Sequence, residues 1–190
     1  MTSRTEAAPR RRGAALEAAL LAATWTELAE VGYADLTFEG VAARAQTSRM
    51  VLYRRWPDRA HLVLAATRRH VTSLTEDIPD TGVLRDDVLT VLRALVEHYR
   101  RMSPATIHGL LAELPGLPCD VLQIVPEVMA TILVRAADRG EVRPGSLAPR
   151  IASLPADLLR HEILLCRKPI ADTTLVEIVD DVFLPLVRIG

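Results

Sequence analysis

Aromatic residues, cysteines and long apolar runs are all scarce in this chain of 190 residues. Aromatics make up 4% of the sequence and apolar residues 49%. This balance, rich in alanine and leucine, favours helices over sheets. The two cysteines, Cys119 and Cys166, lie far apart without metal-type spacing, which predicts a reduced cytoplasmic protein without a disulfide framework. No apolar run reaches the roughly 18 residues of a membrane span, and the charged and polar N-terminus argues against a signal peptide.

Sequence motifs of enzymes are missing as well. The chain has no paired carboxylates at a diagnostic spacing, no HExxH sequence, no glycine-rich phosphate loop and no nucleophile elbow. Its five histidines form no ligand motif. We therefore expect no catalytic residues, no metal site and no cofactor.

Charge is divided unevenly along the chain. Residues 1–70 hold 11 Lys or Arg and 7 Asp or Glu, which gives a balance of +4. Residues 71–190 hold 12 and 17, which gives −5 and accounts for the overall charge of −1. A basic end joined to an acidic remainder is typical of a nucleic-acid-binding head on a body that does not bind nucleic acid.

The hydrophobic periodicity predicts an all-α protein, since no segment shows the alternating polarity of a strand. Pro126 and Pro155 fall inside apolar helical patterns, so each is expected to kink or restart its helix. The start and stop signals place helices at about 13–31, 38–44, 48–55, 58–75, 84–101, 104–113, 119–139, 147–167 and 173–188.

The first three helices have the most explicit end signals. Gly32 is expected to end the first helix as a C-cap. Thr37 is expected to cap the second helix, and Thr47 or Ser48 the third. Two short helices joined by a tight connection, after one longer helix, form the helix-turn-helix arrangement that places its second short helix in the major groove.

The second short helix has two different faces. Leu52 can face the supporting helices, while Arg49, Met50, Tyr53 and Arg54 can face outward. An exposed helix face of this kind, rich in arginine and aromatic surface, adds little to the stability of the fold. It suits contact with phosphates and base edges instead.

These residues closely resemble the tetracycline-repressor (TetR) family over about residues 14–68. The combination is specific, because a glycine–aromatic pair, a capping threonine and a Leu-Tyr-x-x-aromatic-Pro run occur at fixed spacing. The runs that carry the resemblance are Leu28-Ala-Glu-Val-Gly32-Tyr33, Leu36-Thr37-Phe38, Val41-Ala42-Ala43-Arg44-Ala45, Ser48 and Leu52-Tyr53-Arg54-Arg55-Trp56-Pro57.

The resemblance implies roles for individual residues. The hydroxyls of Thr37, Thr47 and Tyr53 would reach phosphates, and Arg44 and Arg59 would approach the DNA backbone. Arg49 and Met50 of the second short helix would reach base edges. The implied DNA-contacting set is Thr37, Arg44, Thr47, Ser48, Arg49, Met50, Tyr53, Arg54 and Arg59.

Three positions depart from the family pattern. Gln46 stands in the turn where the family often has glycine, which predicts strain in a left-handed conformation. Met50 and Val51 replace small or hydroxylated residues. Their apolar surface favours thymine methyl groups over hydrogen bonds, so the usual phosphate contact from Val51 is in doubt.

The remaining helices are strongly apolar, and the resemblance implies that the last two form a dimer interface and that the middle ones enclose a small molecule. Each candidate residue also fits ordinary core packing, and that interpretation stays open. The candidate pocket residues are His98, Tyr99, Met102, Ile107, Leu111, Val125, Met129 and Leu133, with Leu95 and Leu158 as further possibilities. The candidate dimer residues are Leu158, Ile163, Leu175, Val179, Val182 and Phe183.

The sequence thus predicts a DNA-binding regulator with four segments. They are a disordered basic arm (1–12), a helix-turn-helix domain (13–57), a connecting helix (58–77) and a helical ligand-binding and dimerisation domain (78–190). The expected function is that of a homodimeric repressor released from a palindromic operator by a small hydrophobic effector. The alternative is a helical small-molecule-binding or interaction protein that does not bind DNA.

Overall fold

The computed structural model is helical throughout the part of the chain that it describes. Within that part no strand occurs, and one isolated bridge pairs Val142 with Arg188. The predicted all-α class is therefore confirmed. The basic arm predicted over residues 1–12 lies outside the described residues, which are 13–74, 76–114, 119–143, 148–165 and 169–188.

The helix boundaries agree with the sequence prediction to within a few residues. The predicted final helix, 173–188, consists of two short α-helices on either side of a π-helical segment at Ile178–Phe183. In chain order the α-helices are α1 (Ala14–Asp35), α2 (Phe38–Arg44), α3 (Arg49–Tyr53), α4 (Arg59–Leu74), α5 (Leu84–Met102), α6 (Pro104–Glu113), α7 (Cys119–Asp138), α8 (Pro149–Leu165), α9 (Asp172–Glu177) and α10 (Leu184–Val187).

Glycine and proline signals fall at three positions inside the helices. Gly32 has a non-helical φ of 77° and ψ of 174°, which interrupts α1 where the sequence predicts an end, and one more helical turn follows to Asp35. Pro126 lies inside α7 and Pro155 inside α8. Neither proline ends its helix, and the kink expected at each stays a prediction.

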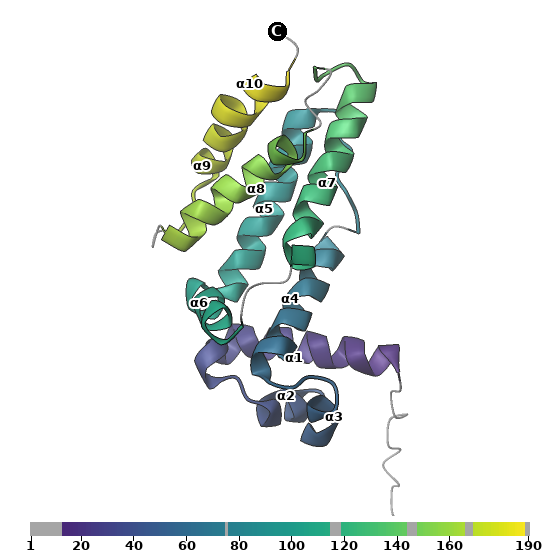
Figure 1. The fold of residues 1–190 in the computed structure, drawn as a ribbon, viewed down its shortest axis with the longest axis vertical. Helices are drawn as coiled ribbons and strands as arrows, with labels where there is room; N and C mark the ends of the chain where they lie inside the picture. The colour runs from purple at the N-terminus through teal and green to yellow at the C-terminus, as the bar shows by residue number, and fades with distance from the viewer. Residues whose placement is uncertain (1–12, 75, 115–118, 144–147, 166–168, 189–190) are drawn as a thin grey trace, which may run out of the picture.

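The molecule consists of a head and an upright body (Figure 1). In the head, α1 lies across the base with α2 and α3 beneath it, and α4 rises from the head into the body. In the body, α5, α7, α8 and the α9–α10 rod stand side by side, and α6 lies at the junction against α1. No described helix combines the length and the apolar character that crossing a membrane requires.

Two hydrophobic clusters form the core. One fills the body, and the other fills the head. The head cluster also includes Met102 at the end of α5 and Ile107, Leu110 and Leu114 from α6 and just beyond it. Helix α6, which follows the first body helix in the chain, therefore packs directly against the head core and lies between the head and the body.

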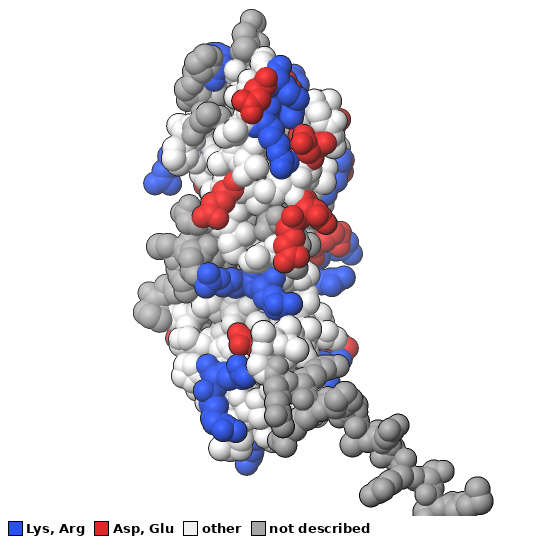
Figure 2. Space-filling model, turned by 90° about the vertical axis from the view of Figure 1, so that its right-hand side faces the viewer, with Lys and Arg blue, Asp and Glu red and all other residues white. Residues whose placement is uncertain are grey.

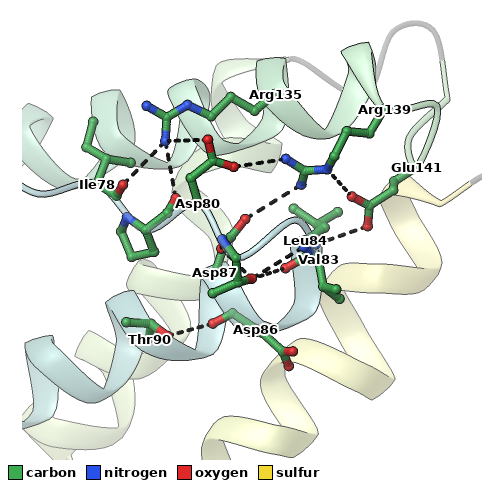
Figure 3. A network of polar contacts seen from close by, with 12 residues as sticks. Ile78, Asp80, Val83, Leu84, Asp86, Asp87, Thr90, Arg135, Arg139 and Glu141 are labelled. Atoms are coloured by element: carbon green, nitrogen blue, oxygen red, sulfur yellow. Dashed lines mark hydrogen bonds and ion pairs between the residues drawn. The ribbon is translucent and has the colours of Figure 1, made fainter.

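A polar cluster, drawn in Figure 3, lies at the end of α7, which is the end of the body opposite the head (Figure 1). Arg139 of α7 lies within ion-pair distance of Asp80, Asp87 and Glu141, at 3.3, 3.6 and 2.6 Å. Arg135 donates to the carbonyls of Ile78 and Pro79 at 3.3 Å. We call Asp80, Asp87, Arg135, Arg139 and Glu141 the far-end cluster; it ties the connection before α5 to the end of α7.

Candidate DNA-binding surface and ligand cavity

Helix α3 divides its residues between the core and the surface, as its sequence predicts. Leu52 is fully buried against the head, whereas Met50 is 58% exposed and Tyr53 51% exposed. Arg49 and Arg54 are also exposed. Basic side chains are spread along the whole face in Figure 2, including the head end, whereas acidic side chains lie mostly in its upper half. The outward side of α3 therefore presents apolar, aromatic and cationic groups together.

The turn before α3 takes the shape that the sequence suggests. Gln46 has a φ of 53°, the left-handed conformation in which glycine is easier to accommodate. The hydroxyl of Thr37 accepts a hydrogen bond from the Gly40 amide at 3.1 Å, so the predicted cap of α2 is confirmed. Ser48, not Thr47, occupies the N-cap position of α3, and its side chain makes no capping bond. The Ser48 hydroxyl is exposed at the same surface as Arg49.

Tyr53 combines packing with exposure. Its ring lies 4.6 Å from that of Phe38, measured between centroids, and tilted by 52°. The ring is thus held against α2 while about half of the side chain remains accessible. Val51 is half-buried and packs against the head cluster, which agrees with doubt about a phosphate contact from this position.

The arginines assigned to DNA differ in what they already contact. Arg49 donates to Glu39 at 2.8 Å, and both side chains are exposed. No partner of the Arg54 guanidinium occurs among the described residues. Arg44 binds Glu27 at 2.8 Å and also Glu30, so it ties α2 to α1. If Arg44 approached the DNA backbone as predicted, the phosphates would compete with these two carboxylates for its guanidinium.

Arg59 is committed to the junction between head and body. Its Nη2 and Nε donate to Glu113 Oε1 at 2.5 and 3.2 Å, and its Nη1 donates to the carbonyl of Ala34 at 3.0 Å. Its guanidinium also lies 4.8 Å from the centroid of the Tyr33 ring. The predicted phosphate contact would require these bonds to break, because they hold the guanidinium against α1 and α6.

Tyr33 completes this arrangement, which we call the junction cluster (Tyr33, Arg59 and Glu113). The Tyr33 hydroxyl donates to Glu113 Oε2 at 2.9 Å. Burial and the Glu113 carboxylate raise the pKa of Tyr33 to about 12, so the hydroxyl keeps its proton. A Cβ on Gly109 would lie 2.4 Å from the Tyr33 ring, so α6 approaches this ring as closely as only glycine permits.

A cavity of about 290 Å³ opens where α4, α5, α6, α7 and α8 meet. Six of the eight predicted pocket residues line it: His98, Tyr99, Met102, Ile107, Leu111 and Val125. Met129 and Leu133 do not, because both are fully buried in the body core. Of the two further possibilities, Leu95 lines the cavity, whereas Leu158 packs against the body core.

Sequence reasoning missed the contributions of α4 and α8 to the cavity. Leu64, Thr67 and Val71 come from the connecting helix, and Arg160 and Leu164 come from α8. The helical spacing of Leu64, Thr67 and Val71 is a signal that could have found the α4 face. Arg160 carries no such signal, since an isolated arginine on a helix is ordinarily exposed.

His98 lies beside this cavity in an aromatic stack. Its ring centroid is 5.1 Å from that of Trp25 and 5.3 Å from that of His70. Burial, with a smaller effect of His70, lowers the pKa of His98 to about 3, so the imidazole is neutral at pH 7. The stack joins α1, α4 and α5.

The predicted dimer residues separate into two groups. Leu175, Val179, Phe183 and Ile163 are buried within the single chain and belong to the body core. Their part in a dimer interface stays a prediction. Val182 is 41% exposed, and Leu158 is half-buried. Leu165 and Leu186 are further exposed apolar side chains on the same helices.

Comparisons with known proteins match both parts of the chain. A family model for bacterial regulatory proteins of the tetR family matches residues 20–66. A model for the tetracyclin repressor-like C-terminal domain matches residues 78–182. Together the two models cover the helix-turn-helix head and most of the helical body.

Individual proteins are similar over nearly the whole length. The chain is 38% identical to an uncharacterized HTH-type transcriptional regulator of Mycobacterium bovis, over 89% of this chain and 86% of the relative. It is 32% identical to a DNA-binding transcriptional repressor TetR of Mycobacteroides abscessus, over 94% and 97%. The crystal structure of the TetR family transcription regulator SCO0332 superposes with a TM-score of 0.66 at 27% identity, over 88% and 96%.

Proposed function

Because this chain belongs to the TetR family of DNA-binding transcriptional regulators, we propose that it represses transcription by binding an operator through α3 and releases it when a small molecule fills the cavity. Ligand-responsive repression is typical of this family, and its members are not enzymes. The alternative of a helical protein without DNA binding is therefore not favoured. As a transcriptional regulator it would act in the cytoplasm, where operator DNA lies.

The observation that carries the proposal is the outward face of α3. Arg49 would reach a base edge, and Met50 would contact a thymine methyl group. The exposed Ser48 hydroxyl and the Tyr53 hydroxyl would donate to phosphates, together with Thr37, Thr47 and Arg54. Phosphate contacts set the register of a protein on DNA, and base contacts set its sequence preference.

Arg44 and Arg59 have a different role in this proposal. Each is held by carboxylates of another helix. We infer that they fix the angle of α2 and α4 to α1, and so the direction in which α3 points, more than they contact phosphates. In the proposed division, residues 13–57 form the DNA-binding domain, 58–77 the connecting helix and 78–190 the ligand-binding and dimerisation domain.

Two copies of the chain would bind one operator. A two-fold dimer sets two recognition helices about one DNA turn apart, roughly 34–36 Å, and so selects a near-palindromic site. The exposed apolar side chains of the last helices, Leu165, Val182 and Leu186, support an interface there, since an apolar surface of this kind gains stability when a partner covers it.

Helix α6 offers a route from the cavity to the head. Ile107, Leu110 and Leu111 on this helix line the cavity. Gly109 and Glu113 on the same helix contact Tyr33 and Arg59 of the head. A ligand that moves α6 therefore acts on the junction cluster directly. Coupling of about 1–3 kcal/mol between the two sites would be ordinary for such a switch.

The decisive experiment measures binding of the full-length protein to DNA flanking its own gene. Fluorescence anisotropy over a series of salt concentrations should reveal one strongly preferred duplex and an affinity that falls steeply with salt. Arg49→Gln should weaken that preferred complex by about 10- to 100-fold, because one bidentate base contact is lost.

Arg100→Gln is the matched control. Arg100 is an exposed arginine on α5 that pairs with an exposed glutamate, as Arg49 does on α3. Its substitution should leave operator affinity nearly unchanged. Equal losses from the two variants, or no preferred duplex at low salt, would rule out the proposed surface.

A further inference from the structure

The cavity wall carries one charged side chain, the guanidinium of Arg160. The other twelve lining residues are nine aliphatic side chains together with Thr67, His98 and Tyr99, and no Asp or Glu among the described residues lines the cavity. Asp157, the ion-pair partner of Arg160 at 2.5 Å, does not line the cavity, so a cationic ligand inside it would meet the guanidinium and no carboxylate of the wall. An anionic ligand would instead gain an ion pair there.

Arg160 has donors to spare for such a ligand. Its Nη1 donates to Asp157 at 2.5 Å, one turn earlier on α8. A guanidinium carries five N–H donors in a planar fork that matches a carboxylate. Burial works against the charged form, but Tyr99 and Asp157 hold the pKa of Arg160 above its ordinary value, so the side chain remains a cation.

His98 of α5, which lines the same cavity, provides a polar atom without a partner among the described residues. The residue is only 2% exposed, and its Nδ1 has no hydrogen-bond partner among the described residues. Buried polar atoms are nearly always satisfied, so an unpaired one beside a cavity points to a group that arrives with the ligand. A neutral imidazole in the Nδ1–H tautomer can donate to a carboxylate oxygen.

The shape of the cavity indicates the rest of the ligand. Its volume of about 290 Å³ is near the lower end of the roughly 300–1,000 Å³ range of small-molecule sites. A second cavity of about 80 Å³ shares Val71, Leu95 and Val125 with it; its lining is mostly apolar but includes Asp77 and Thr90, and Arg160 is not part of it. An aliphatic tail can therefore lie against the shared apolar wall, away from Arg160.

We propose that the effector is a medium-chain aliphatic carboxylate, with its head group held by Arg160 and its tail against the aliphatic wall. This inference rests on the proposed ligand-responsive function, and it adds the chemical class of the ligand. The guanidinium of Arg160, which is the one charged group lining the cavity among the described residues, the unpaired Nδ1 of His98 and the apolar wall all favour it over a cationic or purely apolar compound.

The test compares three ten-carbon probes below their micellar concentrations: decanoate, decanol and decyltrimethylammonium. Isothermal titration of the full-length protein should show decanoate binding more tightly than decanol by roughly 10- to 100-fold, because a charge-assisted hydrogen bond is added. Decyltrimethylammonium should bind more weakly than decanol. Decanol binding as tightly as decanoate, or no binding of decanoate, would overturn the proposal.

Variants of the protein then test whether Arg160 causes the preference for decanoate over decanol. Arg160→Gln should remove the decanoate advantage while leaving decanol affinity nearly unchanged, and Arg160→Lys should restore part of it. Arg100→Gln, on the exposed side of α5, should keep the full advantage. An equal loss in Arg160→Gln and Arg100→Gln would contradict the assignment. Unchanged decanol affinity also establishes that the variant is folded.

The failure of this inference can be separated from failure of the proposed function. If decanol releases the operator as well as decanoate does, ligand-responsive regulation stands and the carboxylate assignment fails. If decanoate binds through Arg160 and leaves operator affinity unchanged, the ligand class stands and release by ligand fails.

Discussion

The junction cluster and the far-end cluster are built from the same kinds of residue, but they join different parts of the molecule. Tyr33, Arg59 and Glu113 connect the head to α6, a helix that also lines the cavity. The far-end cluster connects the start of α5 to the end of α7, opposite the head (Figure 3). One therefore lies between the proposed ligand and DNA sites, and the other lies outside that path.

Burial sharpens this contrast. Asp87 of the far-end cluster is 1% exposed and accepts hydrogen bonds from the amide and hydroxyl of Thr81 at 2.7 and 2.8 Å. Arg59 and Glu113 of the junction cluster are each about one-third exposed. Partly exposed ion pairs contribute little to stability, so the junction cluster can rearrange at low cost. The far-end cluster is suited to holding one arrangement.

The largest expected effect is loss of stability at the far end. Asp87→Ala leaves the Thr81 amide and Arg139 without their buried partner, and should lower the free energy of unfolding by about 3 kcal/mol. Operator affinity per folded molecule should not change. Chemical denaturation and DNA titration of the same variant measure the two quantities.

Asp86→Ala is the matched control, since Asp86 is the preceding residue but is largely exposed and lies 3.7 Å from Arg85. Its effect on unfolding should stay below about 1 kcal/mol. If Asp86→Ala and Asp87→Ala were equally harmful, the far-end cluster would not be the source of stability.

A smaller effect is expected from pH at the aromatic stack beside the junction. Burial depresses the pKa of His98 to about 3, below its ordinary value of 6.5. Between these two values the unfolded chain binds a proton that the folded chain excludes, so stability is full above pH 6.5 and falls as the pH decreases toward 3. From pH 7 to 5 the loss from His98 should be about 2 kcal/mol.

His98→Phe should remove that part of the pH dependence while keeping a ring against Trp25. His108→Gln, at an exposed position on α6, should leave it intact. Thermal unfolding of the three proteins at pH 7 and pH 5 measures the difference. An identical pH dependence in wild type and His98→Phe would show that His98 is not the group responsible.

Local signals explain why the head was predictable. The Thr37 cap and the division of α3 into Leu52 and its outward neighbours depend on residues within one or two turns, and the family resemblance implied the left-handed position of Gln46. Secondary structure and the exposed recognition face follow from such short-range patterns, so the sequence contained them.

Contacts between distant residues explain what was not predictable. Tyr33 and Glu113 stand 80 positions apart, and no periodicity links them. Arg59 matched a family position for DNA contact, yet the fold brings a carboxylate from α6 to it first. Likewise, Met129 and Leu133 share the apolar character of true cavity residues, and only packing shows that they face the core.

The smallest effect on stability, and the sharpest test of the contrast, comes from Glu113→Gln. The side chain keeps its length and can still accept from Tyr33, but it loses the charge that holds Arg59. Unfolding should change by less than about 1 kcal/mol, as expected for a partly exposed pair. The ratio of operator affinities without and with decanoate should nevertheless fall several-fold, because α6 no longer holds the head firmly.

Glu97→Gln provides the comparison for this last variant, because Glu97 forms an exposed pair with Arg100 on α5. Both substitutions remove one surface charge from one ion pair, and they differ in whether the pair spans head and body. A reduced ratio in Glu113→Gln alone would mean that the position of an ion pair, not its strength, determines its role in switching. Equal ratios of operator affinity in both variants would mean that the effect of the ligand reaches α3 by another route. Helix α4, which lines the cavity and enters the head, would then be the remaining connection.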